Sequence, residues 1–169
     1  MTVEQFNALD VASAREVLAA CSGSARWVDA IVAHRPFARR AAVVDAAVAA
    51  WDTLDEGDYA DAIAHHPRIG ESAAAASVTP QAQRWSAAEQ ADVGAAGSAT
   101  IEALAAANAE YESHFGRRFI VFASGKTADE ILVALRSRLQ NDSLTEAAAA
   151  VAELRKITLR RTEKLFASH

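Results

Sequence analysis

The stretch His65-His66-Pro67-Arg68-Ile69-Gly70-Glu71 interrupts a chain that is otherwise patterned as alanine-rich helices. Pro67 has no main-chain N–H and disfavours the helical conformation for His66, so the helix before it should end near Ala64 or the residue after it. Gly70 permits a turn that other residues resist. A histidine held at such a helix end is well placed to face a cleft. A surface loop explains the same residues equally well.

On both sides of this stretch, apolar residues recur at the spacing of helices. Trp27, Val28 and Ile31 share one helical face, and the last helix should run from about Leu144 to Phe166. We therefore predict an all-α fold of about seven or eight helices without a sheet, in a single compact domain over residues 1–169. Capping residues predict helix starts at Thr2, Asp10, Ser24, Ser86, Thr127 and Ser143.

Two segments depart from the helical pattern. In residues 72–83, Thr79-Pro80 breaks the alanine-rich run, and we expect a loop or a short helix. Residues 119–123 form the only strand-like run, and a lone strand has no partner. We interpret this run as a buried extended segment or an irregular helix start, whose main-chain groups would be available to a ligand. A helix imposed by its neighbours is an equally good interpretation.

Composition excludes several classes of protein. The 169 residues carry a net charge of −5, which argues against a nucleic-acid surface. The single cysteine, Cys21, excludes an internal disulfide and fits a reducing cytoplasm. No apolar run is long enough to span a membrane, and the first residues lack the features of a signal peptide. We expect a cytoplasmic protein without membrane or nucleic-acid partners.

Arg161 is an anomaly in the last predicted helix. It falls in the middle of the apolar face formed by Leu154, Ile157 and Leu165, whereas Arg160 lies off that face. An arginine in an apolar stripe must find an anion or extend its head to water. From this pattern alone, an internal ion pair or an extended side chain is favoured over a ligand site.

Glu89 is ambiguous for a similar reason. In Ser86-Ala87-Ala88-Glu89, the glutamate should fold back onto the N–H of Ser86 as part of a capping box. A helix N-terminus also attracts anionic or carbonyl-bearing ligands. Considered alone, the capping role is favoured.

Nothing in the sequence predicts a metal or a cofactor. The histidines and acidic residues lack the spacing of a zinc site. Ser124-Gly125-Lys126-Thr127 ends like a phosphate-binding loop but lacks the upstream glycine, since position 120 is Ile120. Cofactor-free chemistry or simple binding is left.

Six motifs in order give the chain a resemblance to a known family, the 2-oxo-4-hydroxy-4-carboxy-5-ureidoimidazoline (OHCU) decarboxylases. The resemblance covers nearly the whole chain, from the first helix to Phe166. The motifs are His66-Pro67-Arg68-Ile69-Gly70, Ser86-x-x-Glu89-Gln90, Tyr111-x-x-x-Phe115-Gly116, Phe119-Ile120-Val121-Phe122-Ala123-Ser124-Gly125, Arg138-Leu139-Gln140-Asn141 and Lys156-Ile157-Thr158.

The resemblance implies an all-helical enzyme, commonly a homodimer, that decarboxylates OHCU to (S)-allantoin without a cofactor in the third step of urate degradation. It implies that His66, Glu89 and Arg161 are catalytic. The family's tail places one arginine after a leucine, whereas Arg160 and Arg161 both follow Leu159 here, and the helical face favours Arg161. The implied substrate contacts are Pro67, Ser86, Gln90, Ile120, Val121, Phe122, Ala123 and Ser124.

The chemistry of OHCU gives each implied catalytic residue a hypothetical role. His66 would transfer a proton at the hydroxyl or the adjacent carbon. Glu89 would bind ring or ureido N–H groups, and the planar fork of Arg161 would bind an anionic or carbonyl oxygen. A ureide-binding module that does not need His66, and a related cofactor-free decarboxylase or hydrolase, are the alternatives. A pure interaction protein explains the sequence least well.

Overall fold

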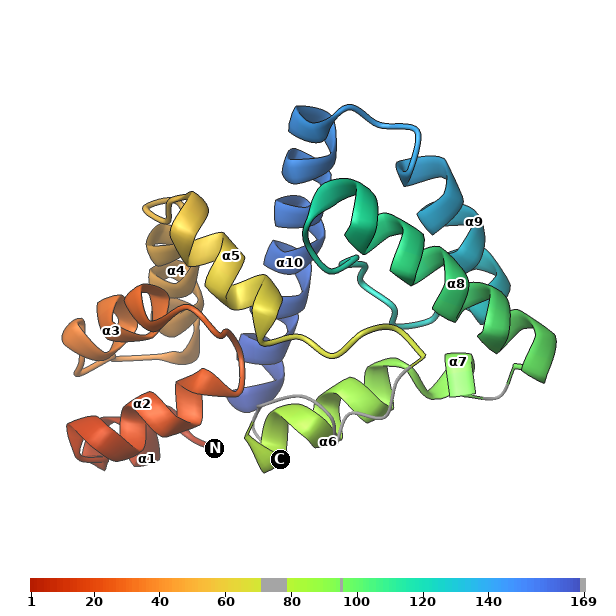
Figure 1. Ribbon diagram of the computed structural model, residues 1–169. Coiled ribbons are helices and arrows are strands. Elements are labelled where there is room, and N and C mark those ends of the chain that lie inside the picture. The colour runs from red at the N-terminus through yellow and green to blue at the C-terminus, as the bar shows by residue number, and fades with distance from the viewer. Residues whose placement is uncertain (71–78, 95, 168–169) are drawn as a thin grey trace.

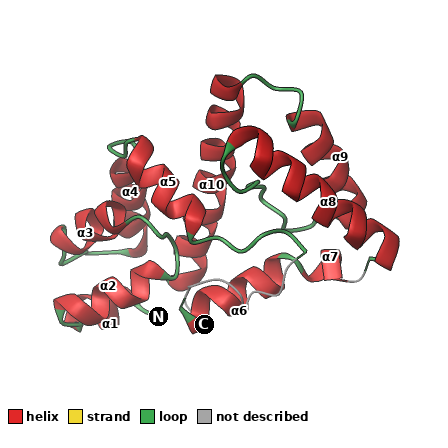
Figure 2. Cartoon of the chain, viewed as in Figure 1, coloured by secondary structure: helices red, strands yellow, loops and turns green. Residues whose placement is uncertain are grey.

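The computed structural model describes residues 1–70, 79–94 and 96–167, and in this part the chain forms ten helices and no strand (Figures 1 and 2). Two of the helices, α1 and α7, are short, with six and four residues, and the other eight have nine or more. The expected all-α fold is therefore confirmed. The helices are α1 (Val3–Ala8), α2 (Val11–Ala19), α3 (Ala25–Ala33), α4 (Arg40–Trp51), α5 (Glu56–Ala64), α6 (Pro80–Glu89), α7 (Ala91–Gly94), α8 (Ser98–Phe115), α9 (Ala128–Arg138) and α10 (Ser143–Leu165).

Four of the predicted caps are confirmed. The side chains of Thr2, Asp10, Ser24 and Thr127 each accept a hydrogen bond from a main-chain N–H three residues later. These bonds satisfy donors that the first turn of a helix leaves unpaired.

The prediction of a helix start at Ser86 is wrong. Helix α6 begins at Pro80, and Thr79 is its cap, with Oγ1 3.2 Å from the N–H of Ala82. Proline suits the first helical position, where no N–H is needed. The loop or short helix expected over residues 72–83 is thus helical from Pro80 onward, while residues 71–78 lie outside the described part. Glu89 ends α6, so it is not a capping-box residue.

The cap of the last helix was also misplaced. Asp142 caps α10 by accepting from the N–H groups of Leu144 and Thr145, at 3.0 and 2.9 Å. Ser143 is the first helical residue. Glu146, in the first turn of α10, is fully buried and accepts hydrogen bonds from Tyr111 of α8 and Arg138 of α9.

The stretch around Pro67 folds as predicted. Helix α5 ends at Ala64, with His65 as its C-terminal cap. Gly70 has a φ of +85°, a conformation that residues with a side chain rarely adopt. This loop leaves α5 and runs beside α6 (Figure 1).

Helix α10 passes through the middle of the molecule, between two groups of helices (Figure 1). Helices α1 to α5 and α10 share one apolar cluster, which includes Phe6, Trp27 and Leu154. Helices α8 and α9 pack against each other over a second cluster, which includes Leu104 and Ile131. Each cluster is built from the apolar faces of amphipathic helices.

Residues 119–123 connect the two clusters and have no regular secondary structure. Ile120 and Phe122 pack in the first cluster, and Phe119, Val121 and Ala123 in the second. This alternation is the two-residue period of an extended chain, with both faces buried. The interpretation as a buried extended segment is confirmed, and the helical alternatives are wrong.

Candidate functional site

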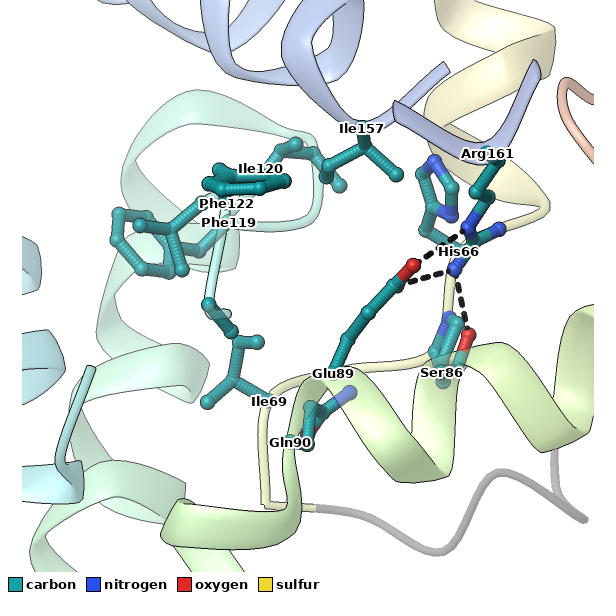
Figure 3. Close-up of a pocket in the computed structure, with 13 residues that line it drawn as sticks. His66, Ile69, Ser86, Glu89, Gln90, Phe119, Ile120, Phe122, Ile157 and Arg161 are labelled. Atoms are coloured by element: carbon teal, nitrogen blue, oxygen red, sulfur yellow. Dashed lines mark hydrogen bonds and ion pairs between the residues drawn. The ribbon is translucent and has the colours of Figure 1, made fainter. Parts of the chain in front are cut away.

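A pocket lies where the loop after α5, helices α6 and α10, and residues 119–123 meet (Figure 3). The family resemblance implies eleven catalytic or substrate-binding residues, and ten of them line this pocket. The exception is Ser124, in the turn that follows the segment. The lining residues are His66, Pro67, Ile69, Ser86, Glu89, Gln90, Phe119, Ile120, Val121, Phe122, Ala123, Ile157 and Arg161.

Three apolar lining residues were not predicted as site residues. Ile69 follows the Pro67 break, Phe119 opens the strand-like run, and Ile157 lies one helical turn before Arg161 on the same buried face. Each belongs to one of the six family motifs, so the sequence did contain information that could have placed all three in the site. Their apolar character made a core position the simpler prediction.

His66 is held in the pocket as a neutral imidazole. Its side chain is buried, with the residue 7% exposed, and its Nε2 atom has no hydrogen-bond partner in the described part of the chain. Burial lowers the pKa of His66 from 6.5 to about 3, and electrostatic interactions with Arg161, His65 and Arg118 act in the same direction. At neutral pH the ring therefore has one nitrogen that can accept a proton.

Glu89 and Arg161 form a bidentate ion pair beside the imidazole of His66 (Figure 3). Arg161 donates from Nε to Oε1 of Glu89 at 3.1 Å and from Nη2 to Oε2 at 2.7 Å. Nη2 also donates to Oγ of Ser86 at 2.8 Å. Arg161 is 4% exposed, so the predicted buried face is confirmed, and the anion that it requires is Glu89.

Lys164 also approaches this carboxylate. Its Nζ atom lies 3.9 Å from Oε1 of Glu89, and its side chain is 33% exposed. Lys164 lies one helical turn after Arg161 and adds a second positive charge beside Glu89.

Gln90 links two walls of the pocket. Its Oε1 atom accepts a hydrogen bond from the N–H of Gly70 at 3.0 Å. This bond ties the loop that carries His66 to the end of α6, which carries Glu89. Gln90 thus holds the loop as well as lining the pocket.

The main chain of residues 119–123 is less available to a ligand than predicted. The N–H of Phe122 donates to Glu153 at 2.8 Å, and its carbonyl accepts from Lys126 at 3.1 Å. The carbonyl of Ile120 accepts from Nη1 of Arg138 at 2.6 Å. These groups are satisfied within the protein, so the segment is a fixed wall.

A buried polar cluster behind this wall orients Arg138. Glu146, which has no exposed surface, accepts from Nε of Arg138 at 2.9 Å, from Asn141 at 2.8 Å and from the hydroxyl of Tyr111. The guanidinium of Arg138 lies 4.7 Å from the ring centre of Phe119. The Arg138-Leu139-Gln140-Asn141 motif therefore supports the pocket wall.

The described residues contain neither a metal-binding cluster nor a membrane-spanning helix. No group of three or more His, Cys, Asp or Glu side chains there could hold a metal ion. No described helix combines the length and the apolar character that crossing a bilayer requires.

The match to a family model decides the classification. Residues 7–163 match the model of OHCU decarboxylase. The chain belongs to the OHCU decarboxylase family. Among solved structures, an OHCU decarboxylase crystallised in the presence of (S)-allantoin has a TM-score of 0.74 and 29% identity, covering 88% of this chain and 95% of that one. An (S)-allantoin synthase structure shares the fold, with a TM-score of 0.68, 17% identity, and 98% and 54% of the two chains covered.

Relatives of this family member also occur within longer proteins. The uric acid degradation bifunctional protein TTL of Arabidopsis thaliana is 33% identical over 147 residues, 86% of this chain and 45% of that protein. The uric acid degradation bifunctional protein of Bacillus sp. (strain TB-90) is 23% identical over 167 residues, 98% of this chain and 32% of that protein. The chain spans less than half the length of both.

Proposed function

We propose that the chain decarboxylates OHCU to (S)-allantoin without a cofactor. Membership of the OHCU decarboxylase family and the likeness to an enzyme crystallised in the presence of (S)-allantoin support this function. The observation that carries it is the unpaired Nε2 of a buried, neutral His66, in one pocket with the Glu89–Arg161 pair.

The substrate itself supplies the electron sink for this reaction. OHCU carries a carboxylate on a ring carbon that also bears a hydroxyl, next to a carbon–nitrogen double bond. When the bond to the carboxylate breaks, its electron pair moves into that unsaturated system and carbon dioxide leaves. A proton must then be added at the neighbouring carbon, and the face to which it is added fixes the configuration of allantoin. The protein has to bind and orient the substrate and to transfer protons to and from it.

His66 is the proposed acid/base group. A neutral imidazole can accept a proton through an unprotonated nitrogen, and the unpaired Nε2 is buried in the pocket. Binding of an anionic substrate places a negative charge near the ring, which raises the pKa of His66 above its value in the empty pocket. The imidazole then transfers a proton at the substrate hydroxyl or the adjacent carbon.

Arg161 and Glu89 are the proposed orienting pair. The guanidinium of Arg161 binds an anionic or carbonyl oxygen of the substrate, and the carboxylate of Glu89 accepts from its ring or ureido N–H groups. Ser86 and Glu89 hold the guanidinium in one plane before substrate arrives. Together with Pro67, Gln90 and the wall of residues 119–123, they present one face of the substrate to His66.

A coupled assay tests the proposed function. Fresh urate, uricase and 5-hydroxyisourate hydrolase generate the substrate, and circular dichroism follows the allantoin that is formed. Rapid appearance of the signal of (S)-allantoin on adding this protein is the expected result. Slow formation of racemic product, at the rate seen without the protein, overturns the proposal and is the result expected of a ureide-binding module.

We further propose a cytoplasmic homodimer. The dimer rests on the family resemblance alone, and the location rests on the single cysteine, which is buried. Light scattering during size-exclusion chromatography tests the first proposal, and a monomeric mass overturns it. Cell fractionation tests the second.

A further inference from the structure

The loop that carries His66 begins with carbonyl groups that α5 cannot satisfy. The last carbonyls of any helix lack N–H partners from the helix itself, and Pro67 has no N–H to offer. Arg118 supplies a donor instead. Its Nη1 atom lies 2.8 Å from the carbonyl oxygen of Ala64 and 2.6 Å from that of His66. A cation at the end of a helix is also favoured by the helix dipole.

The position of Arg118 in the chain gives this contact a further consequence. It directly precedes Phe119, the first residue of the pocket wall, which lies on the other side of the pocket from His66 (Figure 3). One side chain therefore joins the loop that carries the imidazole to the wall that faces it. A second link lies nearby, because Arg68 donates to Glu112 of α8 from Nε at 2.5 Å and from Nη2 at 2.9 Å.

We propose that Arg118 is a positioning residue for His66, which fixes the main chain of the histidine through the carbonyls of Ala64 and His66 and so holds the imidazole toward the substrate. This role for Arg118 depends on the proposed function in one respect, because it takes His66 to be the acid/base group.

The charge of Arg118 supports this role. Burial is the main cause of the low pKa of His66, and electrostatic interactions with Arg161, His65 and Arg118 contribute in that order. The carboxylate of Glu89 faces the same pocket but is paired with Arg161. Arg118 thus acts on the ring in two ways: it fixes where the ring lies, and it helps to keep the ring neutral.

Arg117 provides a matched control. It precedes Arg118 and is also partly buried, but its Nε atom lies 3.4 Å from the carbonyl of Phe115, within its own turn. It has no hydrogen bond to the loop that carries His66 in the described part. Arg117→Met therefore removes a neighbouring charge of the same kind without releasing that loop.

The experiment compares Arg118→Met, Arg118→Lys and Arg117→Met in the full chain, at a temperature well below each melting transition. Steady-state decarboxylation gives kcat and KM. Amide hydrogen exchange is followed at His65 and His66, whose N–H groups bond to the carbonyls of Asp61 and Ile63 at 3.2 and 3.1 Å. Exchange at these two amides reports on the loop and needs no substrate.

We expect Arg118→Met to lower kcat by about tenfold to a hundredfold, as for a small misplacement of a catalytic group, with a smaller change in KM. Exchange at His65 and His66 should become faster. Arg118→Lys should restore part of kcat, because an ammonium group can still reach one carbonyl. Arg117→Met should match the wild type in both measurements.

Two results overturn the proposal: wild-type exchange at His65 and His66 in Arg118→Met, or equal losses of kcat in the Arg118→Met and Arg117→Met proteins. If Arg118→Met does not fold, Arg118→Lys is compared with the wild type by the same criteria. A wild-type protein that fails to decarboxylate OHCU overturns the proposed function alone, since the exchange measurement still judges Arg118.

Discussion

Glu89 and Arg161 lie 72 residues apart in the chain and meet in the pocket through two hydrogen bonds, at 3.1 and 2.7 Å. Both side chains are almost fully buried. The charge of each is therefore compensated mainly by the other, and the pair links α6 to α10 while it faces the ligand space. Stability and activity should depend on the same two residues but respond differently to their removal.

Glu89→Gln should abolish decarboxylation and cost stability. The substitution leaves the guanidinium of Arg161 buried without its anion, and breaking a buried ion pair costs about 3–5 kcal/mol. Since glutamine keeps one acceptor, we expect about 3 kcal/mol, measured by urea denaturation. The double variant Glu89→Gln/Arg161→Met should recover part of the stability and none of the activity. A Glu89→Gln enzyme with wild-type turnover would assign Glu89 to structure alone.

Arg161→Lys should reduce turnover severely although it keeps the positive charge. Lysine cannot bind both oxygens of Glu89 and the hydroxyl of Ser86 in one plane. Arg160→Lys is the control, since Arg160 is exposed and pairs with Glu163 on the surface. Steady-state kinetics of the two variants should differ by a large factor. Greater sensitivity at Arg160 would contradict the assignment.

His66→Asn should abolish enantioselective decarboxylation with little loss of helical structure. Asparagine fits the loop but cannot exchange a proton near neutral pH. His65→Asn should cost much less, because His65 is exposed and its Nδ1 atom contacts the carbonyl of Asp61 of its own helix. Circular dichroism measures both the allantoin formed and the helical content. If the His66→Asn protein kept most of its activity, the acid/base role would be wrong.

The depressed pKa of His66 should make the folded protein less stable in weak acid. The pKa is about 3 in the folded chain and 6.5 ordinarily, so between these values unfolding takes up a proton at His66. The free energy of unfolding therefore rises with pH across this window, with a slope of up to about 1.4 kcal/mol per pH unit from this group. Urea denaturation at pH 5, 6 and 7 should show a shallower dependence in His66→Asn. Identical slopes in the two proteins would mean that His66 is not buried as a neutral ring.

Ser86→Ala and Thr79→Ala should separate the pocket from the helix cap. Thr79 caps α6, so its loss should cost about 1 kcal/mol and leave activity intact. Ser86 accepts from the charged Arg161, so its loss should cost about 1.5 kcal/mol and lower turnover. Thermal unfolding and the coupled assay distinguish the two. Unchanged turnover in Ser86→Ala would limit Ser86 to a structural contact.

Local signals predicted the helices, and tertiary contacts explain where prediction failed. The helix before Pro67 ends where expected, since the main-chain constraints of proline act locally. Residues three apart also share a face within a helix, so Ser86 and Glu89 imitate a capping box while both point at Arg161. The stronger start signal, Thr79 followed by proline, lay seven residues earlier.

The residues of the candidate site were predicted better than the contacts between them. The helical face showed that Arg161 needed an anion or a path to water, but periodicity carries no information on a partner in another helix. The local pattern alone therefore favoured a capping role for Glu89, and only the family resemblance placed it in the site. Glu146 is a similar case, since its partners Arg138 and Tyr111 come from other helices. No local sequence pattern pointed to Arg118, because the carbonyl groups that it binds lie more than fifty residues away in the chain.

The alternating burial of residues 119–123 ties the pocket to the folding of the whole chain. Ile120 is anchored in one apolar cluster, and its neighbours Phe119 and Val121 in the other. A folding intermediate in which only one cluster has formed fixes only alternate residues of this wall. Such an intermediate therefore lacks the complete pocket. Regain of activity during refolding should follow the slower of the two clusters, and neither half of the chain should be active when expressed alone.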